Sequence, residues 1–205
     1  MQIHIGPTDR GRVMTLDEFR EAEQEEGYRY ELTGGVLEVT EVPGDAHRKV
    51  VSRLYSLIAR YHLEHPGIVE AYGGGAEFWL WIPGMISGRS PDLGVVLVGT
   101  QPDERGRTQP QLVAGVVSPG SKARDYQTKR TEYLIFGLRE YWIVDNLEGR
   151  VTILTRAGTT WNEQVFQCQE TLVSSVLPGL ECRVADLWAS VPSEAGTEDG
   201  NGTTR

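Results

Sequence analysis

The chain has 205 residues, of which 39% are hydrophobic and 24% are charged, and this composition is that of a soluble globular domain. Its formal net charge of -9 argues against generic tight binding to a polyanion, because affinity for phosphate comes mainly from neutralising cations. The longest apolar runs are far shorter than the roughly 20 residues of a membrane-spanning helix, and the N-terminus lacks the pattern of a secretory signal. We therefore expect a cytoplasmic protein without a membrane segment.

The two ends of the chain lack hydrophobic periodicity. Residues 1–13 are rich in Gly, Pro and charge, and residues 191–205 are rich in Gly, Thr, Glu and Asp. We predict a flexible segment at each end of a folded domain at residues 14–190. Within that domain, the capping-box sequence that begins at Thr15 predicts a short helix to about residue 26, ended by Gly27.

The next part of the chain predicts a hairpin, a helix and several strands. Residues 28–32 and 36–42 alternate as strands do and are joined by a glycine turn. A stripe with a 3.6-residue period then predicts a helix over residues 45–65 that packs on a sheet. Four strands follow, at residues 68–72, 76–82, 93–98 and 112–117. The last two are apolar almost throughout, which is typical of strands covered on both faces, so we expect them at the centre of the sheet.

The second half of the chain continues this alternation. A helical pattern covers residues 122–136 and is ended by Gly137. Further elements are strands at residues 140–145, 150–155, 161–166 and 171–176 and a closing helix at residues 184–189. No repeat or linker divides the chain, so the sequence predicts a single α/β (α+β) domain with a mixed central β-sheet flanked by helices.

Three residues have the chemistry of a phosphodiester-cleaving site. Such a reaction needs an activated water and a positive group for the growing negative charge, and Mg²⁺ held by two or three carboxylates supplies both. Glu31 lies on an early strand, and Asp92 lies at the start of an apolar strand. Lys129 lies on the helix that follows the second apolar strand. Taken singly, each is more often a turn or surface residue.

The order of short motifs along the chain is more specific than any single residue. The motifs are Tyr30-Glu31-Leu32, His47, Pro91-Asp92, Val117-Ser118-Pro119, Arg124-Asp125, Lys129-Arg130, Tyr133, the run from Arg139 to Asp145, and Leu177-Pro178-Gly179-Leu180. In this order they resemble the Uma-two family, a group of restriction-endonuclease-like proteins within the PD-(D/E)XK nuclease superfamily. The resemblance extends from about Met14 to Trp188.

This resemblance implies a restriction-endonuclease-like fold and an endonuclease that hydrolyses nucleic-acid phosphodiesters with Mg²⁺ or Mn²⁺. Glu31 and Asp92 match metal-binding acidic positions, and Lys129 matches a catalytic lysine supplied from the helix. The expected partner is nucleic acid, DNA in the first instance, and proteins of this fold are often homodimers. A local basic patch would contact the nucleic acid, formed by Lys122, Arg124, Lys129 and Arg130.

Gly115 departs from the family pattern, in which the strand before Ser-Pro carries a glutamate between apolar residues. The departure removes the second metal-holding carboxylate, and two outcomes remain open. Glu31 and Asp92 alone hold the metal and activity is weakened, or the chain is an inactive relative that serves as a nucleic-acid or protein binding module. A third possibility is that a carboxylate from elsewhere in the chain takes the place of the missing one. Glu77 and Asp125 are the nearest candidates in the sequence.

Other interpretations of the polar and aromatic residues are less favoured. A glycosidase with a carboxylate pair would give Lys129 no role. His62 and His65 lack a third ligand of suitable spacing, so we expect surface histidines and no zinc site. The aromatic run at residues 78–81 fits a core better than a contact surface.

Overall fold

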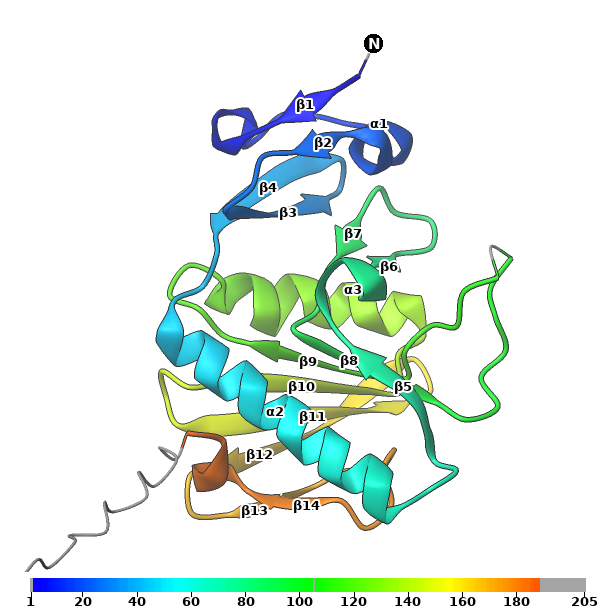
Figure 1. Cartoon of the computed structure of the whole chain (residues 1–205), viewed down its shortest axis with the longest axis vertical. Helices are drawn as coiled ribbons and strands as arrows, with labels where there is room; N and C mark the ends of the chain where they lie inside the picture. Colours follow the sequence, from blue (N-terminus) through cyan, green and yellow to red (C-terminus); the bar gives the residue numbers. More distant parts are fainter. Residues whose placement is uncertain (1, 105, 189–205) are drawn as a thin grey trace, which may run out of the picture.

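The computed structural model describes residues 2–104 and 106–188, so the tail predicted at residues 191–205 lies outside the described residues. The main body is a six-stranded sheet with the order β12-β11-β10-β9-β8-β5 (Figure 1). The strands are β5 (Val69–Gly73), β8 (Leu93–Leu97), β9 (Leu112–Val116), β10 (Glu140–Asp145), β11 (Arg150–Ala157) and β12 (Thr160–Gln167). β9 and β10 are parallel and the other neighbours are antiparallel. The predicted mixed sheet is confirmed, with β8 and β9 in its interior.

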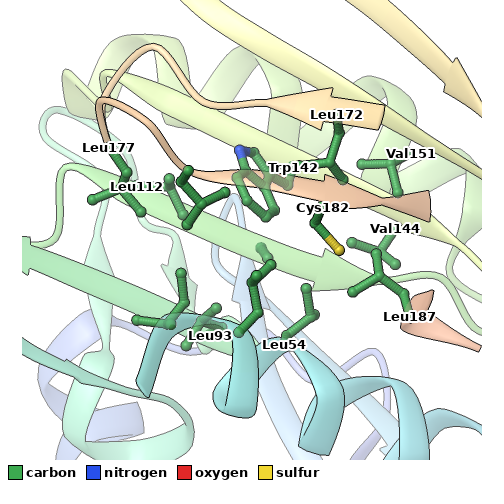
Figure 2. Close-up of a cluster of buried hydrophobic side chains, with 14 of the residues drawn as sticks. Leu54, Leu93, Leu112, Trp142, Val144, Val151, Leu172, Leu177, Cys182 and Leu187 are labelled. Atoms are coloured by element: carbon green, nitrogen blue, oxygen red, sulfur yellow. The ribbon is translucent and has the colours of Figure 1, made fainter. Parts of the chain in front are cut away.

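The long helix α2 (Asp45–Glu64) covers one face of this sheet. Its predicted apolar stripe is buried, and consists of Val50, Leu54, Leu57, Ile58 and Tyr61. The stripe shares a core with residues of the central strands, among them Leu93, Leu112 and Trp142 (Figure 2). Full burial of such side chains contributes about 1.5–3 kcal/mol each. This packing holds the first turn of α2 in a defined place beside the sheet.

The opposite face of the sheet is covered by α3 (Lys129–Phe136). Tyr133 of this helix packs edge-on against Tyr141, with 4.8 Å between the ring centroids. The sequence predicts one continuous helix here, but residues Arg124–Thr128 form a π-helical turn before α3. The helix ends as predicted at Gly137, whose φ of 96° is a conformation that glycine adopts at little cost.

A second, four-stranded sheet contains the predicted hairpin and has the order β4-β3-β7-β6. Its strands are β3 (Tyr28–Thr33), β4 (Val36–Glu41), β6 (Leu80–Trp81) and β7 (Gly88–Arg89). The predicted strand at residues 76–82 is shorter than expected, because a 3-10 turn, η2 (Gly75–Phe78), precedes β6. Trp79 and Trp81 stack on each other at 5.3 Å and pack around Phe19, so the aromatic run is part of a core.

The N-terminal part differs from two predictions. The helix that begins at Thr15 ends at Glu21 as α1 (Leu16–Glu21), because β2 (Glu23–Gln24) pairs in parallel with β1 (His4–Ile5). The predicted flexible segment at residues 1–13 contains β1 and the turn η1 (Pro7–Asp9). Ile5 is buried in the core of the small sheet, and this contact fixes a segment whose sequence has no periodicity.

The chain ends its described part with short elements. They are β13 (Thr171–Val173), β14 (Glu181–Arg183) and η4 (Val184–Leu187). The predicted strand at residues 171–176 and the predicted helix at residues 184–189 are therefore shorter than expected. Within residues 2–104 and 106–188, no helix is long and apolar enough to cross a membrane.

Arg89 on β7 joins the small sheet to α3, although its side chain is fully buried. Its Nε donates to Glu132 Oε2 at 2.6 Å, and its Nη2 donates to Glu132 Oε1 at 3.0 Å. The same guanidinium donates to Thr33 Oγ1 at 2.8 Å and to Glu31 Oε2 at 3.4 Å. A buried charge is tolerated when it is paired and its hydrogen bonds are made. Arg89 therefore fixes β3, which carries Glu31, relative to α3.

We expect Arg89→Met to lower the free energy of unfolding by about 3–5 kcal/mol, because Glu132 would remain buried as an unpaired charge. Urea denaturation followed by circular dichroism measures this loss. The double variant Arg89→Met/Glu132→Leu removes both charges and should recover most of it. A loss for the single variant below about 1 kcal/mol, the value of an exposed pair, would mean that the network does not hold the sheets together.

Candidate active site

A small, partly enclosed cavity of about 40 Å³ lies where the small sheet meets the main sheet. β3 and β4, the first turn of α2, the ends of β8 and β9, and the π turn all contribute to its wall. The lining residues are Arg29, Glu31, Thr40, Glu41, Pro43, His47, Asp92, Val116, Ser118, Ser121, Arg124, Asp125 and Lys129. The three residues that the sequence singles out, Glu31, Asp92 and Lys129, thus line one cavity although they come from three distant segments.

Glu31 reaches the cavity from β3 and is held by several donors and cations. The backbone N–H of Ser90 donates to its Oε1 at 3.2 Å, and Lys129 Nζ lies 3.6 Å from the same oxygen. Its Oε2 lies 3.4 Å from Arg89 Nη1 and 3.7 Å from Arg124 Nε. Burial alone raises the pKa of Glu31, but the charges of these cations outweigh burial and lower it. The carboxylate is therefore ionised at neutral pH.

Asp92 directly precedes β8 and lines the cavity, where its carboxylate is also firmly held. Arg29 Nη1 donates to its Oδ1 at 2.8 Å, and the backbone N–H of Val116 donates to its Oδ2 at 2.7 Å. His47 Nε2 lies 3.4 Å from Oδ2 without completing a hydrogen bond. Burial raises the pKa of Asp92, but His47, Arg29 and the Val116 N–H outweigh it and hold this pKa well below its usual range.

Lys129 and Asp125 form a pair at the π turn. Lys129 Nζ lies 3.1 Å from Asp125 Oδ1, and Ser121 Oγ donates to Asp125 Oδ2 at 2.5 Å. Burial lowers the pKa of Lys129, but the nearby carboxylates of Glu31 and Asp125 outweigh burial and raise it above its usual value. The ammonium therefore stays charged in the cavity and cannot act as a proton acceptor at neutral pH.

Gly115 lies on β9 with space beside it. Ala114 and Val116 belong to the core under α2, whereas Val113 and Val117 belong to the core on the α3 face, so residue 115 faces α3. A Cβ atom at this position would lie 3.4 Å from Tyr141 Oη, which is an ordinary contact. The φ of Gly115 is not positive either. Neither the backbone conformation nor crowding at the Cβ position requires glycine here.

The two neighbouring carboxylates differ in their position relative to the cavity. Asp125 lines the cavity, whereas Glu77 is exposed and is not part of its wall. Sequence reasoning missed Arg29 and the cavity role of Arg124. A signal for Arg29 was present, because it lies two residues before Glu31 on one strand and such residues share a face.

The four residues of the predicted basic patch are each paired. Lys122 pairs with Glu148, Arg124 with Glu38, and Arg130 with Glu163, while Lys129 lies in the cavity. Each of these four cations therefore lies beside at least one acidic side chain, and most of those acids come from other parts of the chain.

The donor set fits a cation that needs few protein ligands. Among residues 2–104 and 106–188, no three His, Cys, Asp or Glu side chains come together to hold a metal ion. Glu31 and Asp92 nevertheless present ionised carboxylate oxygens to one cavity, and Mg²⁺ binds oxygen and keeps several waters. The residues therefore fit Mg²⁺ held by two carboxylates and water, and they do not fit a structural zinc site.

The mixed sheet, the helices on its two faces and the carboxylate-lysine cavity define a domain of the restriction-endonuclease-like class. The chain belongs to the Uma2 family, described as "Putative restriction endonuclease", whose model matches residues 16–185. It is also similar to the crystal structure of a putative nuclease of the DUF820 family from Anabaena variabilis. The two share 20% identity and a TM-score of 0.68, over 85% of this chain and 97% of that one. No curated protein matches the chain.

Proposed function

We propose that this chain is a Mg²⁺-dependent endonuclease with activity reduced by Gly115, and that Mn²⁺ can replace Mg²⁺. The observation that carries the proposal is the convergence of Glu31, Asp92 and Lys129 in one cavity. These three side chains are far apart in the sequence, on β3, at the start of β8 and on α3, so only the fold brings them together. Their meeting place also lies within the part of the chain that matches the nuclease family.

Glu31 and Asp92 would hold the metal, which when bound supplies an activated water and positive charge for the phosphate. The chain's own contribution is to keep both carboxylates ionised and fixed. Arg29 and the Val116 N–H orient Asp92, and the Ser90 N–H orients Glu31. Lys129 would act as a permanent positive charge next to the scissile phosphate, because its raised pKa keeps it protonated.

The proposed substrate is nucleic acid, with DNA as the first candidate, because two open grooves adjoin the cavity. One groove, of about 560 Å³, shares Thr40, Glu41, Pro43 and Ser118 with the cavity. The other groove, of about 410 Å³, shares Arg29, Pro43, His47 and Asp92 with it. A long chain of linked phosphates can lie along such grooves and present one phosphodiester to Asp92. A small phosphate ester would need only the cavity.

A second function, an inactive nucleic-acid or protein binding module, is favoured by one specific observation. Every carboxylate oxygen of Glu31 and Asp92 already has a cation or N–H nearby, and residue 115 supplies no further carboxylate. A cavity whose charges are compensated internally attracts a divalent cation less strongly than one with unpaired carboxylates. The two functions differ in whether cleavage is detected at all.

The proposed function predicts cleavage that requires both Mg²⁺ and Lys129, and an assay of nucleic-acid cleavage tests it. The wild-type chain is incubated with supercoiled plasmid and with labelled single- and double-stranded oligonucleotides, in Mg²⁺ or in chelator. We expect cleavage in Mg²⁺ only, and we expect Lys129→Met to slow it by about a hundredfold or more, since one preorganised charge contributes roughly that much. Lys129→Arg, which keeps the charge, should retain more activity. Cleavage that survives chelation, or equal rates for wild type and Lys129→Met, would contradict the proposal.

A further inference from the structure

The side of α2 that faces solvent differs in charge from the rest of the chain. The chain has 29 acidic and 20 basic residues, yet residues 46–63 of this helix contain no Asp or Glu. The same residues contain four Lys or Arg, which we call the basic side of α2: Arg48, Lys49, Arg53 and Arg60. A helix that is merely solvated usually carries charges of both signs, which pair one turn apart. A surface of one sign on an acidic chain indicates an anionic partner.

Helix geometry arranges three of these cations in a row. Lys49, Arg53 and Arg60 are at positions i, i+4 and i+11, which follow one line along an α-helix. Lys49 and Arg60 are exposed and Arg53 is half-buried, and none of them belongs to the buried stripe. The row is about 17 Å long at the rise of an α-helix. The phosphates of one DNA strand advance about 3.4 Å each along the duplex axis, so the row spans roughly five of them.

The basic side of α2 is continuous with the candidate active site. In Figure 1, α2 crosses the main sheet, and its first turn is the end nearest the small sheet. His47 of this turn lines the cavity. The groove of about 410 Å³ that adjoins the cavity extends along α2 to Arg48 and Ser52. A phosphate chain that lies on α2 therefore reaches the cavity without crossing another element.

A further groove extends the basic side away from the cavity. It has a volume of about 340 Å³, and its wall includes Arg53 and Arg60 of α2 and Arg183 of β14. Glu181 and Asp186 also line it, so cations outnumber acids in this wall. The positive charge of α2 is thus increased by a residue from a distant part of the chain.

The cation nearest the cavity is weakly held by the protein. Arg48 forms an ion pair with Asp45, and the two side chains are 71% and 75% exposed. An ion pair this exposed contributes little to stability. The guanidinium of Arg48 can therefore exchange Asp45 for a phosphate, which accepts the same hydrogen bonds.

The apolar side of α2 distinguishes between two kinds of anionic partner. A helix that binds an acidic membrane inserts a free apolar side below the lipid headgroups. In α2 that side is buried in the core on the main sheet, through residues such as Val50, Leu54 and Ile58. Binding to the phosphates of a nucleic acid needs cations and no free apolar side. The observations therefore favour a nucleic acid over a membrane.

We propose that the basic side of α2 binds the phosphate backbone of duplex DNA and directs it to the cavity. This inference rests on the proposed function, because it assigns a binding surface to the substrate of that site. The contacts are made to phosphates, so the binding is independent of base sequence. A chain with a net charge of -9 can bind a polyanion in this way, because its cations are concentrated on one side of one helix.

Binding of a fluorescently labelled DNA duplex tests this inference without cleavage. Anisotropy is measured with the full chain in chelator at several salt concentrations. We expect Lys49→Gln/Arg53→Gln/Arg60→Gln to weaken binding by about tenfold to a hundredfold at low salt. The slope of the logarithm of affinity against the logarithm of salt concentration should become shallower by about two to three, since each phosphate contact contributes about 0.9 to it.

The matched control is Arg12→Gln/Arg107→Gln/Arg139→Gln, which removes the same charge from exposed positions outside α2 and outside the cavity wall. Its affinity and its salt slope should stay close to those of wild type. Thermal unfolding shows whether both triple variants fold. If the α2 variant does not, the single variants at the exposed residues Lys49 and Arg60 decide, and each should make the slope shallower by about one.

The outcomes separate this inference from the proposed function. Equal affinities and slopes for the α2 variants and the control would overturn the inference, even if the wild-type chain cleaves DNA. Absence of duplex binding by wild type at low salt would also overturn it. Tighter α2-dependent binding to phosphatidylserine vesicles than to the duplex would overturn it in favour of a membrane. Duplex binding that depends on α2, without cleavage in Mg²⁺, would support the inference and contradict the proposed function alone.

Discussion

Gly115→Glu is expected to raise the rate of Mg²⁺-dependent cleavage by about a hundredfold to a thousandfold over wild type, because one preorganised charged group at the reacting centre is worth roughly this range. The backbone and the space at the Cβ position allow a side chain at residue 115. A Cβ atom at residue 115 makes only an ordinary contact with Tyr141, and the backbone has no positive φ. β9 is a central strand that glycine does not help to form, but residue 115 is buried, so the added carboxylate costs stability unless it is paired, and urea denaturation accompanies the assay.

Single-turnover cleavage of a labelled oligonucleotide measures the change caused by Gly115→Glu. Gly115→Gln is the matched control, since it fills the same space without the charge and should leave the rate close to that of wild type. An increase in both variants would point to improved packing of β9 and not to a restored carboxylate. No increase in Gly115→Glu would mean that the cavity does not use an acid from this strand.

Asp92→Ala is expected to abolish cleavage, with a loss of more than a thousandfold from any measurable wild-type rate, because it removes one of only two proposed metal ligands. It also leaves the Val116 N–H and Arg29 without their shared acceptor. Some loss of stability follows from these unpaired donors, so urea denaturation accompanies the assay. The kinetic effect should far exceed the fraction of unfolded protein.

The matched control for Asp92→Ala is Glu70→Ala, at an exposed carboxylate on β5 in the same sheet. We expect its cleavage rate to equal that of wild type. Asp92→Asn is the more conservative variant, and it should also be inactive, because an amide keeps the shape of the side chain but not its charge. If Asp92→Ala cleaved as fast as Glu70→Ala, Asp92 would not belong to the proposed site.

Much of the fold follows from periodicity in the sequence. The stripe on α2 predicts both the helix and its buried face, and the apolar segments of β8 and β9 predict their central place. The short elements could not be predicted in the same way. β1 and β2 are two residues each, and they form because residues 19 positions apart pair with each other, which a local pattern does not record.

The candidate site was predictable only in part, for a physical reason. Glu31, Asp92 and Lys129 were found by their order along the chain, which matches a family pattern. Their partners come from contacts between distant segments, such as the 63 positions between Arg29 and Asp92. The π turn could not be predicted either, because a helical pattern at residues 122–136 does not distinguish π from α hydrogen bonding. The pairing of charges in the cavity could therefore be recognised only from the structure.

The proposed site requires that Glu31 and Asp92 hold a divalent cation without a carboxylate at residue 115. Calorimetric titration of Mg²⁺ and Mn²⁺ into the wild-type chain and into the Glu31→Gln and Asp92→Ala variants measures this most directly. We expect one binding site per wild-type chain, and loss of that site in both variants. Absence of binding to the wild-type chain, or binding that both variants retain, would contradict it.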